Sequence, residues 1–195
     1  FSYLEERPSG AVAERKESGH WFGTDKDGRD LLALIVAGCR TALLPGLVAC
    51  LFALGLGIPL GLLGGYLGGR WAEVIQFANS VVLSFPRLVL ILVVICALDP
   101  DVYLTMAVLG ITAVPRISEI MRTRVGQMAR SGFILAARES GLSDWKILWR
   151  HLFWYQNRTV FFIQASLVMA DSILVETTLS YLQFGTKPPA VSWGN

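Results

Sequence analysis

Apolar residues occur along this chain in long continuous runs. The first run, residues 41–69, holds no charged residue. Because a membrane-spanning helix needs about 20 mostly apolar residues, this run is long enough to cross a bilayer. Three further runs cover about residues 74–98, 102–121 and 159–182. The pattern predicts an all-α fold, a polytopic transmembrane helical bundle with about four spans.

Small residues and prolines modify these runs. Gly57, Gly61 and Gly65 recur at every fourth position of the first run, a spacing that lets two helices pack closely in lipid. The dipeptide Phe85-Pro86 interrupts the second run and predicts a kink. Ahead of the first run, the aspartates of residues 23–30 could suggest a calcium loop, but the later ligands of an EF-hand are missing. A turn that feeds a helix, with Asp30 near its N-terminus, is the favoured interpretation.

A polar segment between the third and fourth runs has a pattern of its own. Residues 135–138 favour a short helix, which Gly141 can end. Ser143 and Asp144 can cap a second helix that extends from Trp145 to about Phe153. A helix–glycine–helix in a polar loop suggests a structure on which a partner docks.

Charge gives the chain an orientation. The composition is 53% hydrophobic and 16% charged, the mean hydropathy is +0.52 and the net charge is +2. Eight of the basic residues lie within residues 116–158, whereas the Asp99-Pro100-Asp101 turn has none. The positive-inside rule therefore places the helix–glycine–helix in the cytoplasm and the acidic turn outside.

Alternation of the spans then gives three regions. Residues 1–40 are an extracytoplasmic loop or arm that contains the GTDxxGRD segment. Residues 41–182 are the transmembrane domain, including a cytoplasmic loop at 122–158, and residues 183–195 form a second extracytoplasmic loop. If both ends of the whole protein are cytoplasmic, one more helix is expected on each side, which makes six spans.

Three ionisable residues fall inside the apolar runs: Arg87, Asp171 and Glu176. Charges at membrane depth are costly, so these side chains should face the bundle or a wet pathway. One interpretation is a pathway lining that meets a zwitterionic peptide or a cation. The other is structural, either an ion pair between Arg87 and Asp171 or a Glu176 side chain that reaches the outer surface.

The sequence offers no site for bond-making chemistry. It has no GxxxxGK[ST] phosphate loop and no Ser/His/Asp arrangement, so we do not expect this chain to be an enzyme. His20 and His151 are far from other ligands, and Cys39, Cys50 and Cys96 have no metal-type spacing. We expect no metal and no cofactor on this chain.

Three motifs give the chain a family resemblance. The first is the GTDxxGRD segment of residues 23–30, and the third is the LSYLQFG segment of residues 179–185 with the nearby Pro188-Pro189 and Ser192-Trp193-Gly194. The second resembles an "EAA" loop and consists of Ala136, Ala137, Gly141, Ser143, Asp144 and His151. In order and spacing the chain resembles C-type permease subunits of binding-protein-dependent ATP-binding-cassette importers for dipeptides, oligopeptides or nickel.

The resemblance implies a MetI-like permease architecture in a bacterial or archaeal cell (inner) membrane. It implies that the EAA-like helix inserts into a groove of a separate ATPase, with ATP bound by that partner. The docking residues would be Leu135, Ala136, Ala137, Arg138, Gly141, Ser143 and Asp144, with Leu135 standing where the family has Glu. Further implied partners are a second permease subunit, an extracytoplasmic substrate-binding protein and membrane lipid, but no nucleic acid.

Two other functions remain open. The polar loop could belong to a membrane scaffold that recruits a cytoplasmic partner. Alternatively, Arg87 and Asp171 could be the coupling groups of an ion-driven secondary transporter, in which internal repeats are expected. For the loop itself, the alternative to docking is an amphipathic helix on the membrane surface, anchored by Trp145, Trp149 and Trp154.

Overall fold

The structure is a computed structural model that describes residues 22–23, 30–98 and 101–182. Most of the GTDxxGRD segment, the greater part of the N-terminal arm and the loop at 183–195 lie outside the described residues, as do Asp99 and Pro100 of the acidic turn. The calcium-loop alternative and the third motif's Gly/Pro part therefore stay predictions.

All regular elements in the described part are helices. The α-helices are α1 (Leu31–Leu67), α2 (Gly69–Leu83), α3 (Arg87–Leu98), α4 (Val102–Ala129), α5 (Gly132–Glu139), α6 (Asp144–Lys146) and α7 (Arg158–Tyr181). A π-helix, η2 (Ile147–Asn157), joins α6 to α7. The all-α prediction is confirmed.

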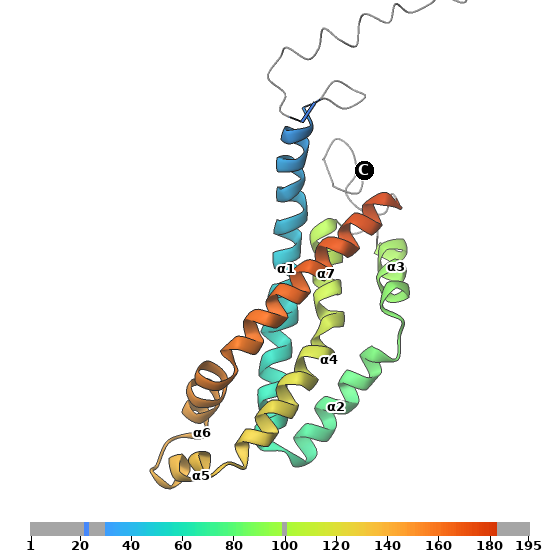
Figure 1. Cartoon of the computed structure of the whole chain (residues 1–195). Coiled ribbons are helices and arrows are strands. Elements are labelled where there is room, and N and C mark those ends of the chain that lie inside the picture. Colours follow the sequence, from blue (N-terminus) through green and yellow to red (C-terminus); the bar gives the residue numbers. More distant parts are fainter. Residues whose placement is uncertain (1–21, 24–29, 99–100, 183–195) are drawn as a thin grey trace, which may run out of the picture.

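Three helices are long and apolar enough to cross a membrane: α1, α4 and the continuous helix Asp144–Tyr181. The helices α2 and α3 qualify together as a fourth span, bent by 72° at the predicted Phe85-Pro86 interruption. In Figure 1 the chain runs down α1, up through α2 and α3, down α4 and up α7. The prediction of about four alternating spans is confirmed.

Glycines bring α1 and α4 close together. A Cβ atom added at Gly61 would lie 2.6 Å from both the Ser118 carbonyl oxygen and the Met121 Cβ, and one at Gly65 would lie 2.6 Å from the Arg122 carbonyl oxygen. Gly57 packs in the same way against Ile117. The predicted small-residue face is therefore the α1–α4 interface, where only hydrogen fits.

Asparagine and serine add a polar link inside the bundle. The Asn79 amide of α2 donates to the Ser118 hydroxyl of α4 at 3.2 Å, and both side chains are buried. In a hydrocarbon interior such a bond satisfies groups that lipid cannot. This hydrogen bond holds α2 against α4 just before the chain bends at Phe85-Pro86.

Aspartates begin two of the spans. The Asp30 carboxylate accepts from the Leu32 N–H, so α1 starts at Leu31, within the segment predicted as an arm. Asp101 accepts from the Leu104 N–H at 2.8 Å and starts α4. Each carboxylate satisfies a backbone donor that the helix leaves free.

Two predicted boundaries within the polar loop were wrong. The helix α4 continues past Met121 to Ala129, and the second loop helix does not end near Phe153. It runs through η2 into α7 as one helix of 38 residues. Inside this segment the Asn157 side-chain amide donates to the Leu152 carbonyl at 2.8 Å. The wider turns of the π-helix accommodate additional residues, so the helix continues without interruption.

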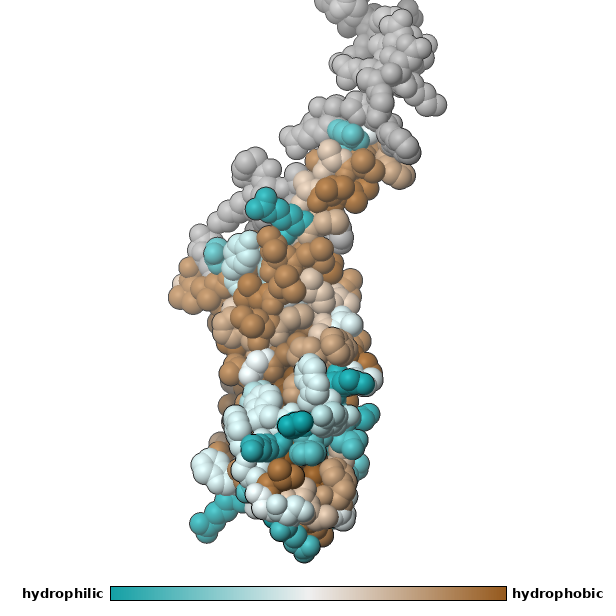
Figure 2. Space-filling view, turned by 90° about the vertical axis from the view of Figure 1, so that its left-hand side faces the viewer, coloured by the Kyte–Doolittle hydropathy of each residue, from teal (hydrophilic) through white to brown (hydrophobic). Residues whose placement is uncertain are grey.

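The surface reflects this architecture. Figure 2 shows hydrophobic residues over the middle and upper part of the visible face, and hydrophilic residues gathered toward the lower end, where α5 and α6 lie in Figure 1. This end also holds the C-terminal end of α1, as the alternation of spans predicts. The polar loop therefore caps one end of an apolar bundle.

Candidate functional site

The short helix α5 ends as its sequence predicts. Gly141 has a φ of 80°, in the left-handed region that favours glycine. The Gly141 N–H donates to the Arg138 carbonyl at 2.9 Å, and the Leu142 N–H donates to the Ala137 carbonyl at 3.2 Å. This pair of bonds is a Schellman motif, and Leu142 and Ala137 both pack against the core as that motif favours.

The helix α5 presents two different faces. Ile134 is fully buried and ties the helix to the bundle. Leu135 is 52% exposed, and Ala136 is exposed beside it. The free face therefore combines a small and an apolar side chain, as expected of a helix that fits into a groove.

A polar cluster joins this loop to α1. The Tyr66 hydroxyl donates to the Asp144 carboxylate at 2.5 Å, and the Arg138 Nε donates to the Tyr66 hydroxyl at 3.1 Å. Arg138 also pairs with Asp144 at 3.2 Å, and its guanidinium lies 4.8 Å from the centre of the Tyr66 ring. The end of α1, the C-terminal turn of α5 and the start of α6 are thus held together by three side chains.

The cluster favours the charged forms of its two ionisable loop residues. The hydrogen bond from Tyr66 lowers the pKa of the Asp144 carboxyl, assisted by the Arg138 charge. The bond with Tyr66 also raises the pKa of Arg138, and the Asp144 charge adds to this. The ion pair therefore persists at neutral pH, although both loop side chains are largely solvated.

The start of α6 differs in one detail from the prediction. Ser143 occupies the N-cap position, but its side chain makes no capping hydrogen bond. Asp144 instead turns toward Tyr66 and Arg138. Beyond it, Trp145 is 64% exposed and stacks edge-on against Trp149, which packs on the core.

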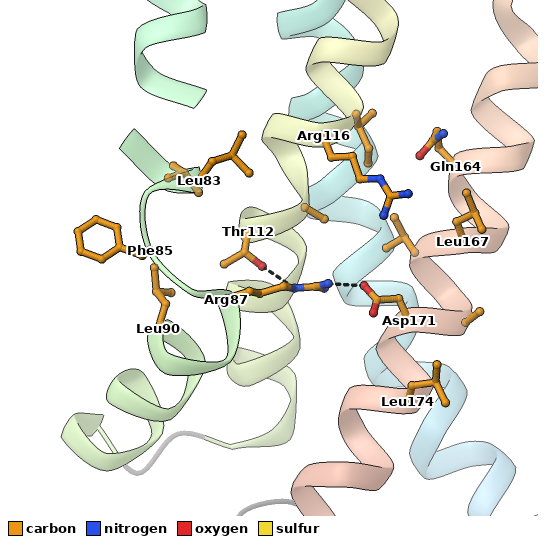
Figure 3. Close-up of a pocket in the computed structure, with 15 residues that line it drawn as sticks. Leu83, Phe85, Arg87, Leu90, Thr112, Arg116, Gln164, Leu167, Asp171 and Leu174 are labelled. Carbon is orange, nitrogen blue, oxygen red and sulfur yellow. Dashed lines mark hydrogen bonds and ion pairs between the residues drawn. The ribbon is translucent and has the colours of Figure 1, made fainter. Parts of the chain in front are cut away.

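The predicted intramembrane pair exists. The Arg87 Nη1 lies 2.5 Å from the Asp171 Oδ2, and the Arg87 Nε donates to the Thr112 hydroxyl at 3.1 Å. Thr112 in turn donates to the Leu109 carbonyl at 2.7 Å. These contacts connect α3, α4 and α7 (Figure 3).

The same pair lines a pocket of about 420 Å³. Its wall also includes Arg116 and Gln164, whose side chains reach the same space in Figure 3. The ion pair is therefore present and also lines a pocket, while a role in a transport pathway stays a prediction. The volume lies within the ~300–1,000 Å³ that is usual for small-molecule sites.

Glu176 lies apart from this pocket. It is 1% exposed and accepts from the Ser180 hydroxyl at 2.7 Å. The side chain is buried, which does not support the interpretation that it reaches the outer surface. Arg87 and Asp171 are brought together, and Glu176 is not among the residues around them.

Some residues of these sites were not singled out from sequence. Tyr66 ends an uncharged run and looks like an ordinary interfacial aromatic residue. Arg116 counts as one more loop cation, and Gln164 and Thr112 are common in apolar helices. Only tertiary packing gives these four residues their neighbours: Tyr66 meets the loop helices α5 and α6, and the other three lie around the pocket between α3, α4 and α7.

Comparison with known proteins agrees with this architecture. Residues 57–195 match the family described as "Binding-protein-dependent transport system inner membrane component". The chain is 32% identical over 194 residues to the dipeptide transport system permease protein DppC of Alkalihalophilus pseudofirmus, a match that covers 99% of this chain and 63% of that protein.

Two further relatives have related names. The glutathione transport system permease protein GsiD of Pectobacterium atrosepticum is 32% identical over 184 residues, or 93% of this chain and 60% of that protein. The oligopeptide transport system permease protein OppC of Bacillus subtilis is 27% identical over 175 residues, or 90% and 57%. The chain spans less than two thirds of the length of each. The family match covers most of the chain, and the long apolar helices agree with it. The chain therefore belongs to the family of inner membrane components of binding-protein-dependent transport systems.

Proposed function

We propose that this chain is part of a permease subunit that carries short peptides across the membrane in an ATP-driven importer. Family membership supports the transport role, and the relatives named for dipeptide, oligopeptide and glutathione transport support the substrate class. The protein itself performs no bond chemistry. A separate ATPase supplies the free energy.

Coupling to an ATPase is supported by one observation: α5 has an exposed face while its other side is held against the helical bundle. Leu135 and Ala136 are free to enter a groove, while Ile134 and the Tyr66–Arg138–Asp144 cluster hold the helix to the bundle. A docking helix has to transmit displacement, so it needs both features. A membrane-surface helix needs no such connection to α1.

The path of the displacement follows the chain. A push on α5 reaches α1 through Tyr66 and reaches α7 through the continuous helix that starts at Asp144. The close α1–α4 contact makes these two helices move as one body. Rigid-body motion of packed helices is a known way to alternate access to a central path.

The pocket at Arg87 and Asp171 is the part of this chain that we assign to the transport pathway. The side chains of this ion pair are 34% and 41% exposed, so at membrane depth they need water or polar partners. A zwitterionic peptide has charged groups of both signs that suit such a surface. In the whole transporter, a second permease subunit completes the path and an extracytoplasmic binding protein delivers the peptide.

Reconstitution tests this function. The full-length protein, its second permease subunit and its ATPases are placed in liposomes, with the binding protein and a radiolabelled dipeptide on the side that receives substrate. ATP-dependent uptake is expected, and it should stop when the ATPase is inactivated. Uptake driven by an ion gradient without ATP would instead identify a secondary transporter, and complete inactivity despite partner recruitment would favour a scaffold.

A further inference from the structure

The pocket beside the Arg87–Asp171 pair contains more positive than negative charge. Arg87 and Arg116 face it, with Asp171 as the acidic member of the lining. Asp171 pairs with Arg87. Within residues 30–98 and 101–182, the Arg116 side chain makes no hydrogen bond or ion pair. One positive charge is therefore uncompensated at the middle of α4.

An amide lines the same pocket as this free guanidinium. Gln164 of α7 is 8% exposed and lines the pocket, and in the described part of the chain its side chain makes no hydrogen bond. Figure 3 shows Gln164 and Arg116 ending on the same side of the Arg87–Asp171 pair. The Gln164 amide is not among the fully buried unpaired polar atoms of the described residues, so its polar end is accessible from the pocket and free to bind a ligand or water.

The break between α2 and α3 gives an independent reason to expect that this wall of the pocket does not face lipid. The carbonyl groups of Leu83, Ser84 and Phe85 accept no hydrogen bond from any described residue. Leu83 and Phe85 line this same pocket. Backbone groups freed at membrane depth are tolerated only against protein or a wet cavity, so this wall of the pocket is not a lipid-facing surface.

We propose that the pocket is a subsite for the carboxylate of the transported substrate, held by Arg116 and Gln164. A guanidinium binds a carboxylate with two parallel hydrogen bonds, and the Gln164 amide supplies a further N–H donor. Arg87 is already paired with Asp171, so Arg116 is the arginine that is free to bind the carboxylate. The assignment rests on the proposed transport function and extends it to a substrate class, peptides with a free C-terminal carboxylate.

Cysteine protection tests the subsite without the binding protein. Leu167, which lines the pocket, is replaced by Cys in a variant of the full transporter complex without other reactive cysteines, held in nanodiscs. A charged, membrane-impermeant maleimide should label it. The probes are dialanine and dialanine amide, which differ only in the carboxylate.

Dialanine should protect the cysteine at concentrations about tenfold lower than the amide, as one charge-assisted contact implies. Arg116→Gln should bring the two half-protection concentrations within about twofold, whereas Arg116→Lys should preserve part of the difference. Arg124→Gln is the matched control, since Arg124 is an exposed arginine on the same helix.

Four results would overturn the subsite. The cysteine could stay unlabelled, which would mean a dry pocket. The preference for the acid could be absent, or could persist in Arg116→Gln. Protection that appears only in nanodiscs with anionic lipid, without added dipeptide, would assign the pocket to a lipid headgroup. ATP-dependent uptake by the unaltered transporter is measured alongside. A failure of the subsite proposal can then be distinguished from a failure of the proposed transport function.

Discussion

The Tyr66 hydroxyl lies 2.5 Å from the Asp144 carboxylate, although 78 residues separate them along the chain. Tyr66 is buried at the end of α1, and Asp144 begins the long helix that contains α7. Arg138, on α5, contacts both. One hydroxyl therefore links two membrane helices to the helix that we propose as the ATPase contact.

Removing that hydroxyl should loosen α5 without unfolding the bundle. Tyr66→Phe loses the bonds with Asp144 and Arg138, at a cost of about 1 kcal/mol because the loop partners can be solvated. Hydrogen exchange in residues 132–144 should quicken severalfold, and more ATP should be hydrolysed per peptide imported. Tyr155→Phe is the control, since Tyr155 is 59% exposed. Equal exchange in both variants would show that the cluster does not hold the loop.

The α1–α4 interface should reject even one methyl group. Gly61→Ala places a Cβ 2.6 Å from the Ser118 carbonyl oxygen, so the helices must separate, at a cost of about 1–3 kcal/mol. A Cβ at Gly55, on the same helix, meets nothing within 4 Å. Thermal unfolding in detergent should therefore distinguish the variants, with Gly61→Ala melting lower and Gly55→Ala close to the unaltered protein. Identical melting would mean that α1 and α4 are not in close contact.

The turn after α5 should depend on glycine for its backbone conformation alone. Nothing lies within 4 Å of a Cβ at Gly141, but its φ of 80° costs other residues about 1–2 kcal/mol. Gly141→Ala should weaken retention of the ATPase without altering membrane insertion. Gly132→Ala, in open space at the other end of α5, should leave retention intact. If both variants retained the ATPase as well as the unaltered protein does, the Schellman turn would not be needed for ATPase docking.

The intramembrane pair should behave as a coupled unit. Arg87→Leu leaves Asp171 unpaired at membrane depth, a penalty of about 2.5–3.5 kcal/mol on insertion scales. Asp171→Leu should also destabilise the protein, and the double variant should recover much of the loss, because neither charge remains. The cycle is measured by thermal unfolding of the purified protein. Additive single effects would show that the two residues act independently.

The sequence was sufficient for the helical class, the number of spans and the bend. A bilayer requires long apolar runs and tolerates proline at a bend, so residues 41–69 and Phe85-Pro86 are readable without any neighbour. The C-terminal end of α5 was equally local, since Gly141 terminates it through its own conformation, whereas α5 starts at Gly132, before the predicted residues 135–138. The Asp30 cap is another local feature.

Other features depend on distant parts of the chain. The continuous helix through residues 153–159 follows from burial of Leu152 and Asn157 against other helices, which no local propensity reveals. The proximity of Tyr66 to Asp144 and of Arg116 to Gln164 is likewise a consequence of tertiary packing. Arg87 and Asp171 could be paired from sequence only because charges at membrane depth need partners.

We propose that α5 is the contact through which a separate ATPase drives this permease. The most direct measurement is retention of the ATPase by the affinity-purified full-length protein carrying Ala136→Trp, an indole on the free face of α5. Ala97→Trp, also at an exposed alanine, is the matched control on α3. We predict that Ala136→Trp inserts normally but loses the ATPase and ATP-dependent uptake, while Ala97→Trp keeps the ATPase. Undiminished ATPase retention and uptake in Ala136→Trp would contradict the claim.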